Sequence, residues 1–142
     1  MKRFISYILY AMLLSGIVCA CNDRLDITQS YAFDLLTMPY AEKIAQGETV
    51  EIRCTLAKEG DFADARYFIR YFQPDGKGEL KLDDGRILTP NDLFPLTKDV
   101  FRLYYTSRCT DRQTIDVYIE NSFGMVIQKT LSFSNENADN EQ

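Results

Sequence analysis

Residues 114–133 read TIDVYIENSFGMVIQKTLSF. The first seven of these residues alternate apolar and polar side chains, which is the period-two pattern of a strand with one buried face. The sequence NSFG then predicts a turn, in which Gly124 suits a left-handed backbone conformation. Met125–Phe133 is the expected return strand. This hairpin is typical of the last two strands of an immunoglobulin-like domain.

The rest of the chain after residue 30 repeats the same period-two pattern. Strand-like stretches separated by turn residues occur at Tyr31–Tyr40, Thr49–Ala57, Arg66–Gln73, Glu79–Leu82 and Asp99–Arg108. Lys43–Ile44 is expected to continue the first of them. Together with the hairpin, these stretches predict an all-β fold, an immunoglobulin-like β-sandwich of about seven strands.

The N-terminus has the features of an export signal. Lys2 and Arg3 precede an apolar run from Phe4 to Val18, which is short for a membrane-spanning helix. The sequence Val-Cys-Ala-Cys follows and ends at Cys21. It resembles the lipobox of bacterial lipoproteins, in which the thiol of the last cysteine accepts the diacylglycerol. An ordinary secretory signal or an uncleaved anchor is the alternative.

These signals divide the chain into four parts. Residues 1–20 are the expected lipoprotein signal peptide, and residues 21–30 form a polar tether. Residues 31–133 form the sandwich, and residues 134–142 an acidic, flexible tail. The product would be exported and lipid-anchored to the cell envelope, on the periplasmic or the outer-membrane side.

Composition argues against several classes of function. The sequence has no His, which removes the commonest general base and metal ligand. Removing Lys2 and Arg3 with the signal leaves 14 of the 16 basic residues against 21 acidic ones, a formal charge of −7. Such a chain has no electrostatic basis for direct nucleic-acid binding. We expect no catalytic residue, metal site, cofactor or small-molecule substrate, and therefore no enzyme.

Two cysteines remain in the predicted domain, Cys54 and Cys109. An exported protein meets an oxidising compartment, so these two residues could form a disulfide. Cys54 lies in the middle of its predicted strand and Cys109 at the end of another, which could place them too far apart. A buried Cys54 and a separate, exposed Cys109 are the alternative.

One strand face alternates arginine with phenylalanine: Arg66, Phe68, Arg70 and Phe72. Pairing of this strand with residues 114–120, as in immunoglobulin-like sheets, would set the arginines against Asp116 and Glu120. It would also bring Phe68 close to Tyr118. Two interpretations stay open: a solvated sheet face held by cross-strand pairs, or a docking surface, because arginine and aromatic residues are enriched in interface cores.

Several strings in the domain also resemble a known family. They are IRYFQ (Ile69–Gln73), Asp75-Gly76 with Gly78, Pro90-Asn91-Asp92, FRLYYTS (Phe101–Ser107), Gln113–Tyr118 and Phe123-Gly124. Together these strings are similar to the TraQ-type conjugative-transposon proteins of Bacteroidetes, over roughly residues 44–133. The resemblance implies a small exported immunoglobulin-like domain encoded with conjugation machinery. It implies no catalytic residues.

The resulting hypothesis is a non-enzymatic, lipid-anchored envelope component of a conjugative transfer apparatus. It would contact the membrane through its N-terminal lipid and other envelope or conjugation proteins through its domain. The alternative is a carbohydrate-binding surface lipoprotein, because lipidated sandwiches often bind glycans. The absence of Trp counts against this alternative.

Overall fold

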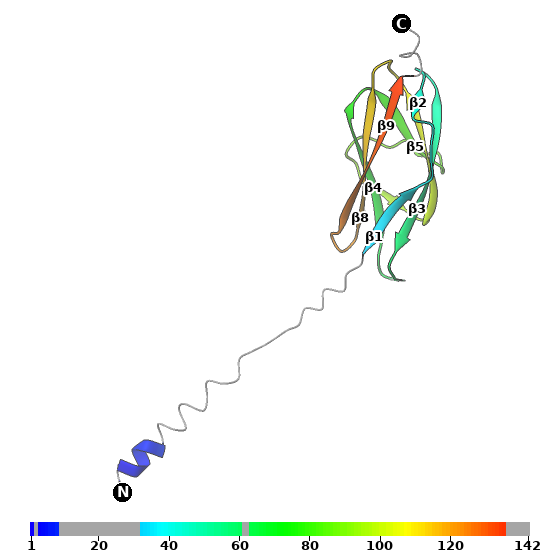
Figure 1. The fold of residues 1–142 in the computed structure, drawn as a ribbon. Helices are drawn as coiled ribbons and strands as arrows, with labels where there is room; N and C mark the ends of the chain where they lie inside the picture. Colours follow the sequence, from blue (N-terminus) through cyan, green and yellow to red (C-terminus); the bar gives the residue numbers. More distant parts are fainter. Residues whose placement is uncertain (2, 9–31, 61–62, 136–142) are drawn as a thin grey trace.

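The computed structural model describes residues 1, 3–8, 32–60 and 63–135 (Figure 1). Residues 3–8 are helical, and no helix among the described residues is long and apolar enough to span a membrane. The described residues contain nine strands: β1 (Phe33–Thr37), β2 (Lys43–Ile44), β3 (Thr49–Lys58), β4 (Tyr67–Asp75), β5 (Gly78–Leu82), β6 (Phe94–Leu96), β7 (Val100–Ser107), β8 (Gln113–Asn121) and β9 (Val126–Asn135).

The strands form two sheets that pack face to face (Figure 1). One sheet has the order β1-β3-β7-β5, and the other has the order β2-β9-β8-β4-β6. The first order matches the ABED sheet of an immunoglobulin domain, and β4, β8 and β9 match its strands C, F and G. The predicted all-β sandwich is therefore confirmed.

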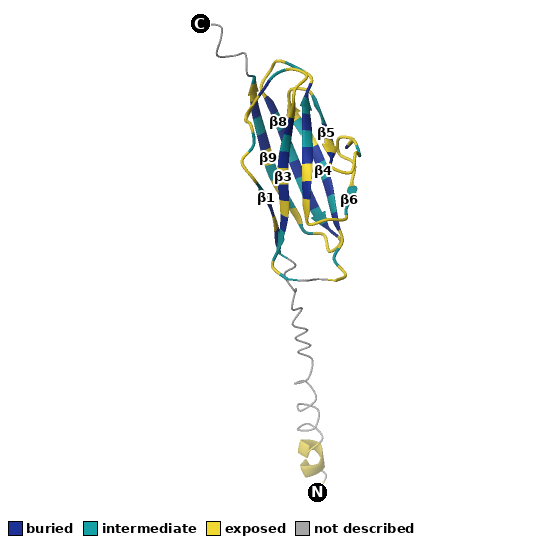
Figure 2. Cartoon of the chain, turned by 90° about the vertical axis from the view of Figure 1, so that its right-hand side faces the viewer, coloured by how far each residue is buried: buried dark blue, intermediate teal, exposed yellow. Residues whose placement is uncertain are grey.

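Alternation along each strand places the core between the sheets. In β3 every second residue from Val50 to Leu56 is buried, while the residues between them are exposed or half-buried. Strand β8 alternates buried and half-buried residues along its whole length. Bands of buried and more exposed residues are visible along the strands in Figure 2. Burial of the apolar side chains between the sheets drives the folding of such a domain.

The strand count exceeds the prediction because two short strands join the second sheet. The chain crosses between sheets at Pro39, since the N–H of Met38 still bonds to Arg53 of β3 (2.9 Å). Strand β2 then runs parallel to the end of β9. Strand β6 contains Pro95 and pairs with the start of β4. A proline is tolerated there because β6 is an edge strand.

A buried polar network connects β7 and β8 at one end of the sandwich. The hydroxyl of Tyr105 donates to Gln113 Oε1 (2.6 Å) and accepts from Gln73 Nε2 (2.7 Å). Gln113 Nε2 donates to Ser107 Oγ (2.8 Å). Gly78 lies so close that a Cβ there would overlap the Tyr105 ring. The network thus satisfies polar groups that burial would otherwise leave without partners.

Candidate functional site

The alternating arginine and phenylalanine residues lie where strand β4 faces outward. Phe68 and Arg70 are half-buried and Phe72 is 48% exposed, whereas Tyr67, Ile69 and Tyr71 between them are buried. Arg66 immediately precedes the strand and is exposed. Tyr118 is half-buried on the same side of the neighbouring strand β8. We call Arg66, Phe68, Arg70, Phe72 and Tyr118 the aromatic–arginine face.

The register between β4 and β8 differs from the one we expected. Arg70 is paired with Tyr118, whereas Phe68 is paired with Glu120 and Phe72 with Asp116. The predicted pairing of the arginines with the two carboxylates is therefore wrong. A shift of two residues explains the difference, because it exchanges cross-strand neighbours and leaves every side chain on the same sheet face.

Arg70 is held in place without a carboxylate. Its guanidinium carbon lies 5.1 Å from the centre of the Tyr118 ring, which is a cation–π distance. Nη1 donates a long hydrogen bond to Asn91 Oδ1 (3.4 Å). Nε is buried and has no hydrogen-bond partner. Among the described residues, no carboxylate forms an ion pair with Arg70.

Asn91 belongs to the site, although we did not predict it. It has a positive φ of 68°, and its N–H donates to the carbonyl of Tyr71 in β4 (2.9 Å). That backbone bond places the amide side chain beside Arg70. Asparagine is one of the few residues that tolerate this conformation, and this tolerance was the only signal in the sequence.

The carboxylates of Asp116 and Glu120 are diagonal neighbours of Arg70 across the β4–β8 pair, and neither forms an ion pair with it. Asp116 accepts a hydrogen bond from Thr130 Oγ1 on β9 (2.6 Å). Glu120 lies across from Phe68 on one side and Val126 on the other. Arg66 exchanges backbone bonds with Ser122, through Ser122 Oγ (3.1 Å) and the Ser122 N–H (2.8 Å). Among the residues that the structure describes, the face therefore has none of the cross-strand ion pairs by which a purely structural role was expected to hold it.

The disulfide that Cys54 and Cys109 could have formed is absent, and both thiols are free, with Cys54 buried and Cys109 half-buried. Cys54 is paired with Phe101 near the start of β7, while Cys109 lies beyond the end of that strand. Eight residues of extended chain separate these positions, which is about 26 Å. A disulfide requires Cα atoms within about 7 Å, so the strand direction excludes the bond. Cys109 Sγ instead accepts a hydrogen bond from the N–H of Lys77 (3.1 Å).

Buried acidic groups, among them Cys54 and Tyr105, should make the domain sensitive to alkaline pH. Burial raises the pKa of Cys54 from 9.0 to about 12, and burial raises the pKa of Tyr105 from 10.0 to about 12. The unfolded chain loses these protons first as the pH rises, so the free energy of unfolding should fall between pH 9 and pH 12. At 1.4 kcal/mol per pKa unit, Cys54 alone would account for up to about 4 kcal/mol.

This decrease can be measured by urea unfolding at a series of pH values. In Cys54→Ala the decrease should be shallower, because the ionisation of the Cys54 thiol is removed while those of the buried tyrosines remain. The quantity compared is the slope of the free energy of unfolding against pH. A loss of stability from the smaller side chain that is the same at every pH does not change this slope. Identical slopes for the wild type and the variant would contradict the burial of an ionisable thiol at this position.

The comparisons with known proteins agree with this fold. The family model for the TraQ conjugal transfer protein matches residues 4–136. The chain belongs to the TraQ family. A search of curated proteins gave no match.

Three solved structures are similar to this TraQ-family chain over most of its length. A lipoprotein from Bacteroides thetaiotaomicron is 55% identical, with a TM-score of 0.71, and the match covers 85% of this chain and 93% of that one. A conjugative transposon lipoprotein from Bacteroides eggerthii is 43% identical (TM-score 0.70; 75% and 100% covered). A conjugate transposon protein from Bacteroides vulgatus is 49% identical (TM-score 0.67; 79% and 91% covered). TraQ membership supports a role in conjugative transfer.

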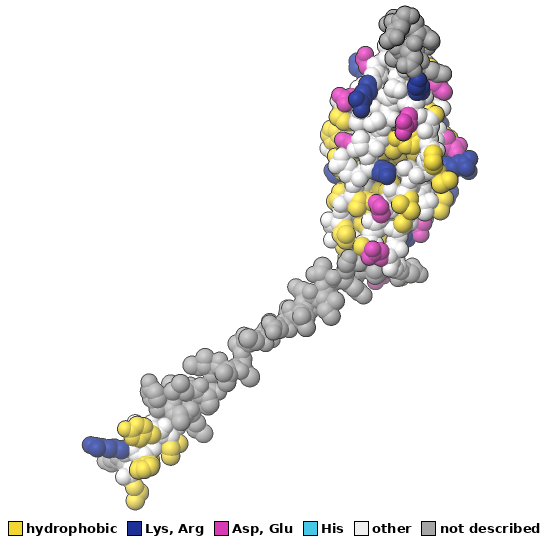
Figure 3. Space-filling view, viewed as in Figure 1, with side chains coloured by type: hydrophobic (Ala, Val, Ile, Leu, Met, Phe, Trp, Pro, Cys, Tyr) yellow, Lys and Arg dark blue, Asp and Glu magenta, His cyan; other side chains and the backbone are white. Residues whose placement is uncertain are grey.

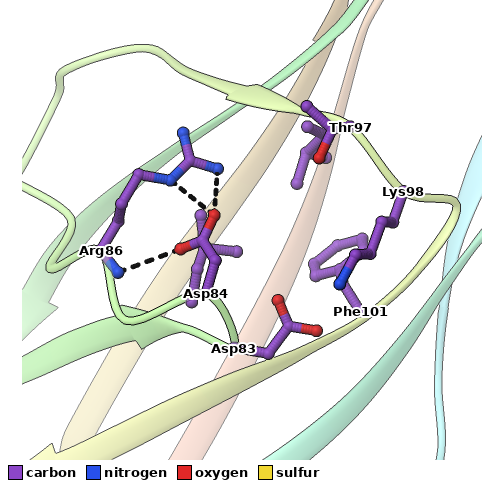
Figure 4. Close-up of a pocket in the computed structure, with 8 residues that line it drawn as sticks. Asp83, Asp84, Arg86, Thr97, Lys98 and Phe101 are labelled. Carbon is purple, nitrogen blue, oxygen red and sulfur yellow. Dashed lines mark hydrogen bonds and ion pairs between the residues drawn. The ribbon is translucent and has the colours of Figure 1, made fainter.

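The hollows of the TraQ-family domain differ in size, and one of about 430 Å³ lies between the segment after β1 and the start of β3. The one in Figure 4 has a volume of about 40 Å³, far below that of a small-molecule site. There Arg86 binds the carboxylate of Asp84 (2.7 Å) and the carbonyl of Pro95 (2.9 Å), so the residues fasten β6 to the loop after β5. A shallower hollow of about 370 Å³ adjoins the aromatic–arginine face at Arg66 and Phe68.

The remaining site predictions concern lipidation of Cys21, metal binding and the aromatic–arginine face. Cys21 lies outside the described residues, so its lipidation stays a prediction. No cluster of three or more candidate metal ligands occurs among the residues that were placed. The aromatic–arginine face is the predicted site whose members the structure brings together.

Proposed function

We propose that the chain is a non-enzymatic, lipid-anchored envelope component of a conjugative transfer apparatus, and that it acts through protein–protein contacts. Its TraQ membership supports the transfer role. Two of the similar solved proteins are described as lipoproteins, one of them a conjugative transposon lipoprotein. This description supports Cys21 as the lipid attachment site, with residues 1–20 removed and residues 21–30 as the tether.

The observation that carries the contact proposal is the state of Arg70. The Arg70 guanidinium stacks on Tyr118, makes only one long hydrogen bond through Nη1 and has no carboxylate partner among the described residues, so its half-buried terminal nitrogens could bind a carboxylate of a partner. Phe72 beside it exposes 48% of its surface, although it is a large apolar side chain. Arginine and aromatic residues with this arrangement dominate the binding energy of many protein interfaces. The partner would be another envelope or conjugation protein.

Substitutions on the two outer sheet faces test this proposal. Arg70→Gln and Phe72→Ser should each lower transfer frequency from a donor strain, because both remove contact groups without opening the core. Val100→Ser is the matched control, since Val100 is 68% exposed on the opposite sheet. An interface hot spot contributes about 2 kcal/mol or more, so partner affinity should fall roughly 30-fold or more.

Transfer frequency is compared at equal protein levels, measured by immunoblot of donor membranes. The control variant should transfer like the wild type. If Arg70→Gln and Phe72→Ser also transferred like the wild type, the aromatic–arginine face would not be the contact surface. Membership of the TraQ family would be unaffected by that result.

A further inference from the structure

Half of strand β9 forms an open edge of the second sheet. Strand β2 pairs with β9 only at Ser134 and Asn135. The N–H groups of Ser132 and Ser134 point away from β8, toward the Tyr40 hydroxyl (3.4 Å) and the Glu42 carbonyl (2.8 Å). Because backbone direction alternates along a strand, the N–H groups of Gln128 and Thr130 point to the same side. No other strand pairs with that side of residues 126–130 in the described structure.

The outward-facing side chains along this edge are exposed and uncharged. Val126, Gln128 and Thr130 are exposed on the outer face, and none of them is charged. Figure 3 shows hydrophobic side chains with only scattered charges on the side of the domain that carries β9 and β1. Strand β1 approaches β9 across the sandwich, but it pairs with β3 and forms no ladder with β9. The backbone groups of residues 126–130 are therefore available for pairing.

Lys129 places a cation on the inner side of this edge. It is paired with the buried residue Val117, so its side chain points toward the gap between the sheets. Lys129 is half-buried, as expected for an inward-pointing side chain at the rim of the sandwich. Among the described residues, no carboxylate forms an ion pair with Lys129.

An inward-pointing lysine on an edge strand discourages pairing with a second copy. In an antiparallel pair of two β9 strands, Lys129 would meet another Lys129 or an apolar neighbour such as Ile127 or Leu131, and its charge would stay unpaired. A strand with a carboxylate at the facing position would neutralise the charge instead. The same lysine thus rejects the chain's own copy and favours an acidic strand.

We propose that residues 126–130 of β9 receive an extended segment of a partner protein, which adds a strand to the sheet and carries Asp or Glu opposite Lys129. Backbone hydrogen bonds would supply the attachment, and the carboxylate would supply the selectivity. Gln128 is paired with Tyr118, so the added strand would widen the sheet surface that bears the aromatic–arginine face. The proposal does not require that face to be a contact surface.

Selection from a library of random nine-residue peptides, with the purified full chain as bait, tests this proposal. We expect selected peptides to alternate in polarity and to carry Asp or Glu at a fixed position. Their binding should protect the amides of Gln128 and Thr130 from hydrogen exchange. Lys129→Glu should convert the selected acid to Lys or Arg, while Lys81→Glu on β5 of the other sheet should leave the selection unchanged.

Gln128→Pro provides the test of backbone pairing. Its N–H points away from β8, so proline should remove the edge donor without breaking the β8–β9 ladder, and unchanged urea unfolding would verify this. The selected peptides should then bind more than about tenfold more weakly. Absence of any enriched peptide, binding unaffected by Gln128→Pro, or an acid preference that persists in Lys129→Glu would overturn the proposal.

Discussion

Phe133→Ala is expected to lower the free energy of unfolding by about 3–5 kcal/mol, the usual cost of removing a buried aromatic ring. Phe133 is 1% exposed, and its ring stacks on Tyr105 with centroids 5.0 Å apart. The ring of Tyr40 also packs against the Phe133 ring, with centroids 5.4 Å apart. The substitution would therefore open a cavity between β7, β9 and the segment before β2. A small domain has a total stability of only about 5–15 kcal/mol, so the loss should be large.

Urea unfolding at neutral pH measures this loss. Val126→Ala is the control on the same strand, because Val126 is 48% exposed and a surface substitution changes stability by less than about 0.5 kcal/mol. A cost below about 1 kcal/mol for Phe133→Ala would contradict its place in the core.

Cys21→Ser is expected to abolish fatty-acid labelling of the chain and its retention in the membrane fraction. Each buried methylene of an acyl chain contributes about 0.8 kcal/mol to membrane binding, so losing the whole anchor should release the domain. Cys19→Ser is the matched control, because Val18 precedes Cys19 where a lipobox has a small residue. Label that persists in Cys21→Ser, or a wild type without label, would contradict lipidation at Cys21.

The sandwich could be predicted from the sequence because alternation is a local property. Strands β3 and β8 alternate so regularly that their inner faces follow from the residue types alone. The short strands β2 and β6 could not be predicted as separate strands. Two and three residues give too little pattern, and Pro95 argues against a strand unless its edge position is known.

Register is the property that alternation leaves undetermined. Sliding β4 along β8 by two residues keeps Arg70 on the outer face and only decides whether it meets a carboxylate or Tyr118. The same limit applies to the cysteines. Alternation can place both cysteines on the inner faces of their strands, where a disulfide could form. Their positions along the strands nevertheless place them far apart. The open edge beside Lys129 likewise depends on where β2 stops pairing with β9.

The transfer frequency of a donor that lacks only this chain tests most directly whether the domain acts in conjugation from a membrane anchor. An in-frame deletion should lower transfer by at least about tenfold, as expected when an assembly loses a contact worth about 1.4 kcal/mol or more. The wild-type chain should restore transfer and Cys21→Ser should not. Equal transfer frequencies from the deletion strain and the wild type would contradict a required role, and full rescue by Cys21→Ser would contradict the anchor.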